Sequence, residues 1–549
     1  MTAEQLSGGE ALVRGLIQHG VDTVFGLPGA QMYGFFDGLY THRDVIRTFS
    51  ARHEQGAAYM AFGAAKSTGV PAVYSVVPGP GVLNTTAALC TAWGCNTPIL
   101  CVTGQVPSAF LNQGRGHLHE LPDQLATLKS LSKWSHRIDS VADTSRAVSE
   151  AFRQMLSGRP GPATLEMCWD IMLEPGPFVE HDSIGPDPIP EPDARQLGNA
   201  LELIAAARRP MIMVGAGAQH ASTEVLALAE ALSASVTSFR SGRGIVAEDH
   251  ALGAGSAAAH ELWDETDLLI GIGSRCEMQY MRWAQMMELH RRPLGGPKLI
   301  RIDIDPTEML RLIPDAALVT DSAFGCNLLL ERLSTTKIDH TKNRLRIAEA
   351  KLSAREKYTR VQPEVGYLDV IRDVLPRDGF LVEELCQAGF ASYYAFPVYE
   401  PRTYVTPGFQ GTLGYGFPTA LGVKAANPDK AVVSIIGDGG FMFGITELAS
   451  AVQHKLGVVC LIFNNSSFGN VRRDQLTRFD GHVIGADLIN PDFLKLADSF
   501  GLSGFRVDTP DGLQPVLEKA IADETPAIVE IVIEKDSEVS PWEFVSFQR

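Results

Sequence analysis

The chain comprises 549 residues, of which 45% are hydrophobic and 20% charged, and this composition excludes extended disorder. A single hydrophobic core does not grow to this length, so the length predicts three domains of about 180 residues each. The net charge of −17 argues against nucleic acid or an anionic membrane surface as a partner, because no basic face is evident to offset it.

The start of the chain and its cysteines bear on location. The N-terminal residues lack the basic-then-apolar layout of an export signal. No apolar run reaches the roughly 18 residues that a membrane-spanning helix needs. The eight cysteines are scattered and form neither a CxxC pair nor a zinc-binding spacing. These features predict a cytoplasmic protein with reduced thiols and no membrane partner.

The first predicted elements are a helix over Gly9–His19 and a strand over Asp22–Gly26. Three short motifs follow, GLPGA at residues 26–30, RHEQGAA at residues 52–58 and VPGPG at residues 77–81, with Asn84 close behind the third. Glu54 stands within the second motif. Taken alone, this glutamate is either a solvated residue on a helix face or a carboxylate with a chemical role.

Two linker-like segments, called seams here, divide the chain into three parts. Residues 175–192 are rich in proline and acidic residues, which resist helix and sheet and predict a linker. The charged stretch 336–362 predicts a solvated helix followed by a short connection. Three strands are expected between the seams, and the first ends at Gly-Ala-Gly (215–217). These strands are Pro210–Val214, Asp267–Ile272 and Leu299–Ile304.

The seams predict three domains and two linkers. The predicted order is a first domain at 1–175, a linker at 176–192, a central domain at 193–335, a linker at 336–362 and a last domain at 363–549. The sequence PATLE (162–166) is echoed by PAIVE (526–530), near the ends of the outer domains. The echo is a weak sign of duplication, because strands at the edge of a sheet commonly end in this way.

The segment from Val432 to Gly469 is the most informative part of the chain. Two apolar runs, Val432–Ile436 and Val458–Phe463, are short and rich in valine and isoleucine, as is typical of strands buried in a parallel sheet. Thr446–Lys455, between them, carries apolar residues at helical spacing. The segment predicts a strand–helix–strand unit, whose strands end at one edge of the sheet, where α/β proteins bind ligands.

Asp438 and Asn465 follow these two strands and are expected to lie side by side. A carboxylate, an amide oxygen and a nearby main-chain carbonyl suit Mg²⁺, which completes its shell with phosphate oxygens and water. Gly437 and Gly439 flank Asp438 and would let the backbone close on those phosphates. The sequence therefore predicts a magnesium and phosphate site, and the alternative is an ordinary crossover with no cofactor.

The combination of GDGG (437–440) and NN (464–465) resembles the thiamine diphosphate motif of the decarboxylase and acetolactate synthase group. The three N-terminal motifs match the pyrimidine-binding half of these enzymes, and further matches to the acetolactate synthase branch stand at residues 104–107, 158–162, 302–305 and 411–418. The resemblance spans Gly9 to about Pro541. It implies an α/β fold of three doubly wound parallel-sheet domains, which are pyrimidine-binding, central and diphosphate-binding.

The resemblance also implies roles for individual residues. Glu54 corresponds to the carboxylate that bonds the aminopyrimidine ring and activates the cofactor, for which it needs a largely dry pocket. Leu413 corresponds to the apolar residue that bends the cofactor, unless it is plain core packing. Mg²⁺ would be held by the side chains of Asp438 and Asn465 and by the backbone oxygen of Ser467. The other implied cofactor contacts are Pro28, Gly29, Pro80, Asn84, Gln387, Gln410, Thr412, Gly437, Gly439, Gly440, Phe468 and Gly469.

The positions that would meet the substrate depart from the resembled synthases. His119 replaces a glutamine, Gln279 replaces an arginine that recognises a carboxylate, and Asp474 replaces a tryptophan that selects bulkier acceptors. Glutamine cannot supply the bidentate, charged grip of arginine, so synthesis of branched-chain precursors is not the expected role. His119 is either a proton donor or acceptor, or a residue that bonds across the loop Gln113–Asp123.

A flavin is a further cofactor that the resemblance raises. Acetolactate synthases bind FAD through the central domain without using it for redox chemistry, and many relatives leave that domain empty or use it for another nucleotide. Both outcomes stay open for this chain. The residues that match parts of the FAD-binding pattern are Arg159, Gly215, Gly217, Arg275, Asp303 and Asp321.

The implied reaction is decarboxylation of a 2-oxo acid, with pyruvate as the expected donor, and attack of the resulting enamine on a second carbonyl compound. In the resembled enzymes the counterpart of Glu54 and the diphosphate site come from different subunits. A homodimer is therefore the minimum active unit, and a homotetramer is compatible with it.

Several alternatives to this reaction remain. Within the family they are a 2-oxo acid decarboxylase, a 1,2-diketone-cleaving lyase and a flavin-coupled pyruvate oxidase. A non-catalytic relative that binds the cofactor and acts through partners is another. An NAD-dependent dehydrogenase is the alternative from a different class, but it lacks a GxGxxG sequence and leaves the GDGG and NN pair unexplained.

Overall fold

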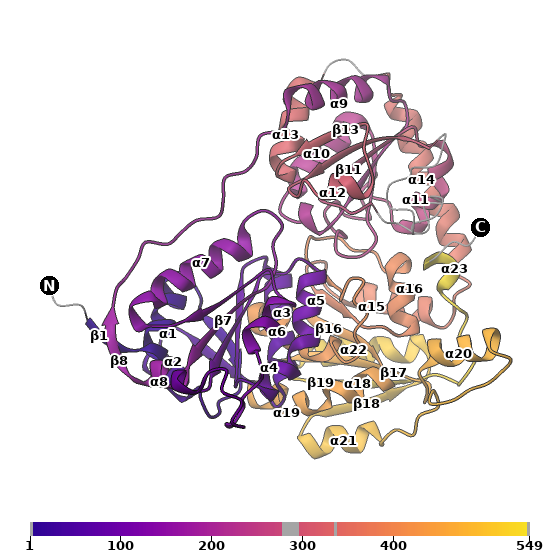
Figure 1. The fold of residues 1–549 in the computed structure, drawn as a ribbon. Coiled ribbons are helices and arrows are strands. Elements are labelled where there is room, and N and C mark those ends of the chain that lie inside the picture. Colours follow the sequence, from indigo (N-terminus) through magenta and orange to yellow (C-terminus); the bar gives the residue numbers. More distant parts are fainter. Residues whose placement is uncertain (1–3, 277–295, 334–336, 546–549) are drawn as a thin grey trace. The chain divides into compact units, whose positions relative to one another are not determined.

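The computed structural model describes residues 4–276, 296–333 and 337–545. Its strands form three parallel sheets and one antiparallel pair (Figure 1). Contacts divide the chain into two compact units. The first comprises Met1–Pro188, Pro407–Asp429 and Met442–Gly457, and the second comprises Ile189–Thr406, Lys430–Phe441 and Val458–Arg549. The predicted domains are consecutive stretches of the chain, whereas each of these units combines separate segments. The predicted domain boundaries stay a prediction.

The first sheet has six parallel strands in the order β3-β2-β4-β5-β7-β6. The strands are β2 (Thr23–Gly26), β3 (Arg47–Ser50), β4 (Ala72–Val76), β5 (Ile99–Gln105), β6 (Trp134–Ile138) and β7 (Ala163–Cys168). The helices of this region are α1 (Gly8–Gln18), α2 (Tyr33–Thr41), α3 (Glu54–Thr68), α4 (Pro80–Asn84), α5 (Thr86–Gly94), α6 (Gln124–Lys129), α7 (Thr144–Leu156) and α8 (Trp169–Leu173). The central strands β4, β5 and β7 are buried along their whole length, as expected when helices cover both faces of a parallel sheet.

The second sheet has five parallel strands in the order β10-β9-β11-β12-β13. The strands are β9 (Pro210–Val214), β10 (Ser235–Thr237), β11 (Leu268–Ile272), β12 (Lys298–Asp303) and β13 (Ala316–Val319). The helices are α9 (Ala194–Ala206), α10 (Ser222–Leu232), α11 (Ser256–Leu262), α12 (Glu308–Arg311), α13 (Ser322–Arg332) and α14 (His340–Tyr358). The three strands predicted here are confirmed to within one residue, because each contains a short stretch of aliphatic residues, although β12 also carries the charged residues Lys298, Arg301 and Asp303.

The third sheet has six parallel strands in the order β15-β14-β16-β17-β19-β18. The strands are β14 (Phe380–Glu383), β15 (Tyr404–Val405), β16 (Val432–Gly437), β17 (Val458–Asn464), β18 (Ser503–Val507) and β19 (Ala527–Val532). The helices are α15 (Glu364–Val374), α16 (Gln387–Ala395), α17 (Gly416–Ala426), α18 (Asp438–Gly444), α19 (Leu448–Gln453), α20 (Gly469–Arg478), α21 (Phe493–Phe500), α22 (Pro510–Ala522) and α23 (Trp542–Val545).

The two six-stranded sheets have the same topology. When the strands of each are numbered in chain order, both sheets read 2-1-3-4-6-5. PATLE leads into β7 and PAIVE into β19, with the proline of each just before the strand, and each of these is the last strand of its sheet in chain order. Both strands lie between two neighbours, so the edge-strand explanation of the echo is wrong. The shared topology supports a duplication.

Two local predictions are wrong. β8 (Pro175–Phe178) lies in the first predicted linker and pairs antiparallel with β1 (Glu4–Ser7). Proline is tolerated there because a two-stranded sheet consists only of edges. The helix predicted over Thr446–Lys455 is shorter, Leu448–Gln453, and an additional helix, α18, begins at Asp438.

Within the described residues, no helix combines the length and the apolar character needed to cross a bilayer.

Candidate active site

Glu54 is the first residue of α3 and is held by its neighbours in the first unit. The helix starts there because His53 adopts extended backbone angles and its ring accepts a hydrogen bond from the backbone N–H of Gln55 (3.1 Å). Asn84, at the end of α4, donates from Nδ2 to Oε2 of Glu54 (3.0 Å). The structure thus brings together the predicted activating carboxylate and a predicted cofactor residue.

Glu447 fixes the backbone that leads into α3, a role that no sequence motif indicated. This buried carboxylate accepts hydrogen bonds from the backbone N–H groups of Arg52 (3.1 Å) and His53 (2.9 Å) and from the hydroxyl of Ser450 (2.6 Å). Burial raises the pKa of Glu447. A side chain at Gly56 would place its Cβ 2.3 Å from Glu447, so the RHEQGAA motif needs a glycine there.

The other N-terminal motifs form loops that pack on each other. Gly29, which follows Pro28 after β2, faces Val77, and a Cβ on it would lie 2.5 Å from a methyl group of that residue. Gly79 has a φ of 63°, and its Cβ would lie 2.4 Å from the carbonyl oxygen of His119. Pro80 opens α4 at the position where its missing N–H costs nothing. These loops bring the residues of all three motifs close to His119.

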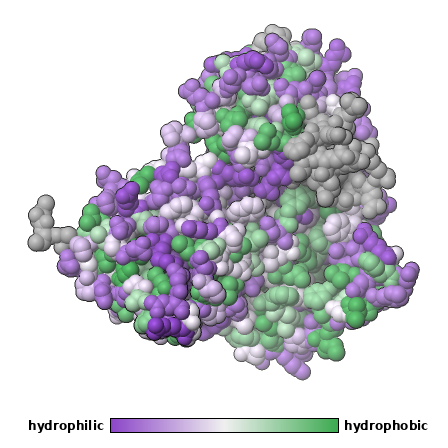
Figure 2. All heavy atoms as spheres, viewed as in Figure 1, coloured by the Kyte–Doolittle hydropathy of each residue, from purple (hydrophilic) through white to green (hydrophobic). Residues whose placement is uncertain are grey.

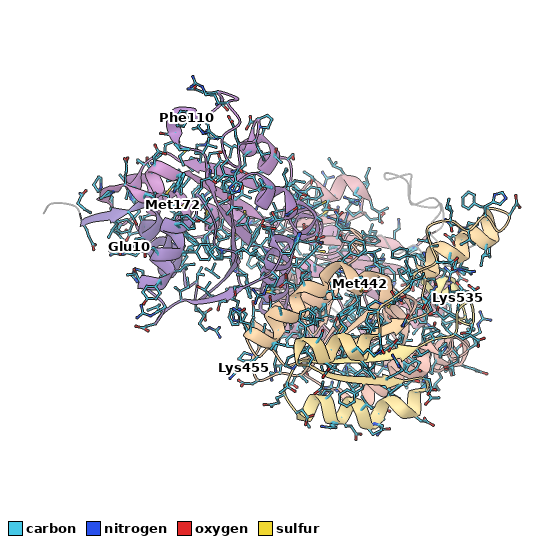
Figure 3. The ribbon with its side chains drawn as sticks, turned by 90° about the horizontal axis from the view of Figure 1, so that it is seen from below. Glu10, Phe110, Met172, Met442, Lys455 and Lys535 are labelled. Atoms are coloured by element: carbon cyan, nitrogen blue, oxygen red, sulfur yellow. The ribbon has the colours of Figure 1, made fainter. Side chains whose placement is uncertain are left out.

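His119 contacts a residue that was not predicted. Its Nδ1 lies 2.6 Å from Oε1 of Gln31, in the loop after β2. The alternative of a bond across its own loop is therefore wrong for Nδ1. Burial lowers the pKa of His119, and nearby Glu54 opposes this shift. Figure 3 shows Phe110 on the segment that precedes His119, and its ring lies 4.1 Å from that of His117, between ring centres.

Gln410, Thr412 and Leu413 belong to the first unit. Gln410 accepts a weak hydrogen bond from the thiol of Cys90 (3.5 Å), and the hydroxyls of Thr412 and Thr91 lie 3.1 Å apart. Leu413 is only partly buried, and core packing stays the alternative to a role at the cofactor. Its role as a steric wedge stays a prediction.

A second group of predicted residues lies at the carboxyl ends of β16 and β17, in the second unit. Asn490 joins the two ends, because its Nδ2 donates to Oδ2 of Asp438 (2.6 Å) and to Oδ1 of Asn464 (3.1 Å). The side-chain oxygen of Asn465 accepts from the backbone N–H (3.1 Å) and hydroxyl (2.9 Å) of Ser467. The strand–helix–strand prediction correctly put both strand ends at one edge, and Asn490 was missed because it arrives from a distant loop.

Asp438 has the environment of a cation ligand. Its side chain is buried, and burial raises its pKa to about 6. Among the described residues, no lysine or arginine forms an ion pair with it. A divalent cation would offset the cost of this buried charge. Mg²⁺ therefore fits Asp438, with Asn465 and Ser467 as the other predicted ligands.

The glycines of GDGG have a packing role in addition to the predicted one. A Cβ on Gly439 would lie 2.4 Å from the ring of Phe468, and one on Gly440 would lie 2.0 Å from a carboxylate oxygen of Glu384. A Cβ on Gly469 would lie 2.7 Å from Nδ2 of Asn465. Gly437 is less constrained, with Cys386 at 3.2 Å. Close approach to phosphate is thus not the only reason for these glycines.

A polar cluster surrounds Gln387, the first residue of α16. Nη1 of Arg473 lies 3.4 Å from Oε1 of Gln387, and the guanidinium also donates to Asn470, which accepts from the indole of Trp542 (2.6 Å). Burial lowers the pKa of Arg473. Arg473 and Asn470 lie on α20, as does Asp474, which faces Arg478 at 3.7 Å. The cluster places an arginine beside a residue predicted to hold the diphosphate.

The cluster also contains two buried carboxyl groups that the sequence did not reveal. Glu538 accepts a hydrogen bond from Nδ2 of Asn465 (2.6 Å), and Glu364 lies beside Glu538. Burial raises the pKa of both. The charge of Glu538 raises the pKa of Glu364 further, whereas a hydrogen bond with Glu364 partly opposes the rise in the pKa of Glu538.

The residues predicted to bind FAD already have protein partners. Gly215 and Gly217 pack on Gly273, where their Cβ atoms would lie 2.3 Å and 2.9 Å from its atoms. Asp321 accepts from two N–H groups at the start of α13 and lies 2.7 Å from His220.

The remaining FAD residues are divided between the units. Burial raises the pKa of Asp303 to about 6, and Arg275 lies 3.9 Å from Glu308. Arg159 belongs to the first unit. Gln279, the predicted replacement of an arginine at the substrate site, lies outside the described residues. These contacts neither require a flavin nor exclude one.

The domain comparisons identify the class of this protein. Residues 6–127 match the N-terminal TPP binding domain of thiamine pyrophosphate enzymes, residues 197–333 match the central domain, and residues 386–531 match the C-terminal TPP binding domain. The chain belongs to the thiamine pyrophosphate enzyme family, and it is a thiamine diphosphate-dependent enzyme of three parallel-sheet domains. The expected family and fold are confirmed, and the dehydrogenase alternative is excluded.

Several relatives align with nearly the whole of this chain. A probable 2-ketoarginine decarboxylase (AruI) of Pseudomonas aeruginosa is 33% identical over 96% of this chain and 94% of its own length. A probable acetolactate synthase large subunit of Methanocaldococcus jannaschii is 31% identical over 96% of this chain and 92% of its own. An acetolactate synthase of Arthrospira platensis is 31% identical over 98% and 96%.

Proposed function

We propose that this enzyme uses thiamine diphosphate and Mg²⁺ to decarboxylate a 2-oxo acid and joins the remaining fragment to a second carbonyl compound. The observation that carries this proposal is the way in which Glu54 is held. Asn84 donates a hydrogen bond to its carboxylate, and Glu447 accepts hydrogen bonds from the backbone of the two residues before it. When bound, thiamine diphosphate supplies the nucleophilic carbon and the electron sink that decarboxylation requires.

The protein residues would bind the cofactor and the metal ion and would hold a proton at the cofactor. Glu54 would bond a ring nitrogen of the cofactor and hold a proton there. Asp438, Asn465 and Ser467 would hold the Mg²⁺ that binds the diphosphate, with Gln387 beside it. Leu413 would press against the cofactor, and Asn84 would keep the carboxylate of Glu54 oriented.

A second candidate is decarboxylation, without carboligation, of a 2-oxo acid with a cationic end, such as 2-ketoarginine. The observation that favours it is the polar character of α20, in which Asn470, Arg473 and Asp474 all lie within about one and a half turns. Asp474 offers a carboxylate where the resembled synthases have tryptophan. The identity of 33% to the probable 2-ketoarginine decarboxylase adds to this support.

One assay separates the two candidates. The enzyme is incubated with thiamine diphosphate, Mg²⁺ and either pyruvate or 2-ketoarginine, and CO₂, acetolactate and free aldehyde are measured. Acetolactate from pyruvate supports the first candidate, and aldehyde from 2-ketoarginine supports the second. Asp474→Asn should raise KM for 2-ketoarginine about tenfold and leave KM for pyruvate unchanged, because it removes one charge–charge contact.

We propose a homodimer as the minimum active unit, with a homotetramer as the alternative assembly. Support comes from α20, none of whose residues is buried although Val471 and Leu476 are apolar. Phe479, Ile484 and Ile489, which follow the helix, are also exposed. Hydrophobic residues gather over the C-terminal part of the chain on the face drawn in Figure 2. Exposed apolar surface of this kind is typical of contacts between subunits. Sedimentation measures the oligomeric state.

FAD in the central domain stays a separate proposal, which rests on the resemblance to acetolactate synthases. The purified protein should be colourless if the contacts of Gly215, Gly217 and Asp321 are complete in themselves. Absorbance near ~450 nm would instead reveal a bound flavin.

A further inference from the structure

Gln31 and His119 share an unusual backbone conformation. Their φ angles are 69° and 65°, in the left-handed region that residues other than glycine seldom adopt. Such backbone is energetically unfavourable and persists where the surrounding structure enforces it, often at functional sites. The two side chains meet, with Oε1 of Gln31 2.6 Å from Nδ1 of His119.

The backbone determines which way the amide of Gln31 faces. Nε2 of Gln31 donates to the carbonyl oxygen of Leu118 (2.7 Å), and a carbonyl oxygen can only accept a hydrogen bond. The reversed amide would set two acceptor oxygens against each other. Oε1 must therefore face His119.

This orientation determines the tautomer of His119. Oε1 can only accept, so Nδ1 at 2.6 Å must carry the proton. In the neutral imidazole, Nε2 is then unprotonated and is an acceptor. Within the described part of the chain, Nε2 has no hydrogen-bond partner. Gln31 is only 2% exposed, so water does not compete for its amide.

The charge state of the ring agrees with this role. Burial lowers the pKa of His119, and Glu54 is the charged group that opposes this shift. The ring is thus mainly neutral near pH 7, with Nε2 free to accept.

We propose that Gln31 is a positioning residue that holds His119 in the Nδ1–H tautomer, so that Nε2 accepts the proton of the hydroxyl group that forms when the carbonyl of the bound 2-oxo acid or acceptor is attacked. The O–H bond breaks, the electron pair stays on oxygen, and an Nε2–H bond forms. The resulting imidazolium keeps its Nδ1–H bond to Gln31 and later returns the proton to solvent or product. This inference rests on the proposed function and deepens it.

Nuclear magnetic resonance of ¹⁵N-histidine-labelled protein without substrate tests the tautomer. The His119 signals are assigned by their loss in His119→Asn. Above the titration of the ring, Nδ1 should have the shift of a protonated nitrogen and Nε2 that of an unprotonated one. The reverse pattern, or an even mixture, would overturn the inference. The measurement needs no turnover, so it stands even if the proposed substrates are wrong.

Two variants of Gln31 test its consequence, with Gln113 as the matched control. Gln113 also donates to a backbone carbonyl, that of Ala109 (2.8 Å), but it does not contact His119. Gln31→Met should mix the tautomers and lower kcat at least tenfold, while KM changes less than threefold. Gln31→Glu should raise the pKa of His119 and move the acidic limb of the rate profile to higher pH. Gln113→Met and Gln113→Glu should leave the rate and the profile unchanged. A purely structural role would instead lower activity equally at every pH.

Discussion

At the scale of single residues, the chemistry depends on carboxylates whose surroundings differ sharply. Glu54 is partly exposed and is bonded by an amide, Asp438 is buried and bonded by an amide, and Glu447 is buried and bonded by backbone N–H groups. In the proposed mechanism Glu54 carries out proton chemistry and Asp438 holds a cation, whereas Glu447 supports the backbone before α3.

The first prediction concerns Glu54. Glu54→Gln should lower turnover of the accepted 2-oxo acid by at least 100-fold, because it removes the carboxylate that holds a proton. Binding of thiamine diphosphate, measured by quenching of tryptophan fluorescence, should weaken less than tenfold. Asn84→Ala, which keeps the carboxylate but removes its hydrogen bond (3.0 Å), should lower turnover less than Glu54→Gln does. Unchanged turnover in Glu54→Gln would refute the role of Glu54.

The second prediction concerns the buried pair of Glu364 and Glu538. Burial and the neighbouring carboxyl group raise the pKa of Glu364 above the value of about 4.3 in an unfolded chain. The folded state therefore retains a proton that the unfolded state loses, and stability falls as pH rises above about 4.3 towards the raised pKa. Glu364→Gln should flatten the decline of the melting temperature between pH 6 and pH 9. Exposed Glu356, changed to glutamine, should leave the decline as it is.

At the scale of elements, glycine allows the close approach of α3 and α17. A Cβ on Gly63 would lie 2.1 Å from the carbonyl oxygen of Thr419, and one on Gly422 would lie 1.9 Å from that of Met60. The start of α3 carries Glu54, so this contact fixes the direction from which the carboxylate projects.

The third prediction follows from this contact. Gly63→Ala or Gly422→Ala should destabilise the protein by about 1–3 kcal/mol, because the added methyl group meets backbone that cannot move aside. A Cβ on Gly198, within α9, would instead enter open space, and Gly198→Ala should be neutral or slightly stabilising. Chemical denaturation measures all three. Equal stability of Gly63→Ala and Gly198→Ala would contradict the packing.

The sequence predicts the structure best for buried strands, which can be recognised from a few consecutive residues. β9, β11, β12, β16 and β17 follow from short apolar runs, and the meeting of two strand ends follows from parallel topology. α18 was missed because a glycine-rich start reads as a loop, and β8 because proline reads as a linker. Asn490, Glu447 and Gln31 could not be predicted, because each reaches its partner from a distant part of the chain.

At the scale of the whole molecule, the residues predicted to bind the cofactor are distributed over two compact units. Glu54 and Leu413 belong to the first unit and Asp438 and Asn465 to the second. We propose that Glu54 of one copy works with the diphosphate site of another copy. This arrangement would make the dimer, and not the single chain, the unit of catalysis.

Complementation between two inactive variants tests this claim most directly. Glu54→Gln and Asp438→Asn, carrying different affinity tags, are expressed separately and together, and the mixed dimer is purified through both tags. Each variant alone should be inactive, and a mixed dimer should regain one of its two sites and about half of the wild-type activity. A mixed dimer as inactive as its parents would contradict the account.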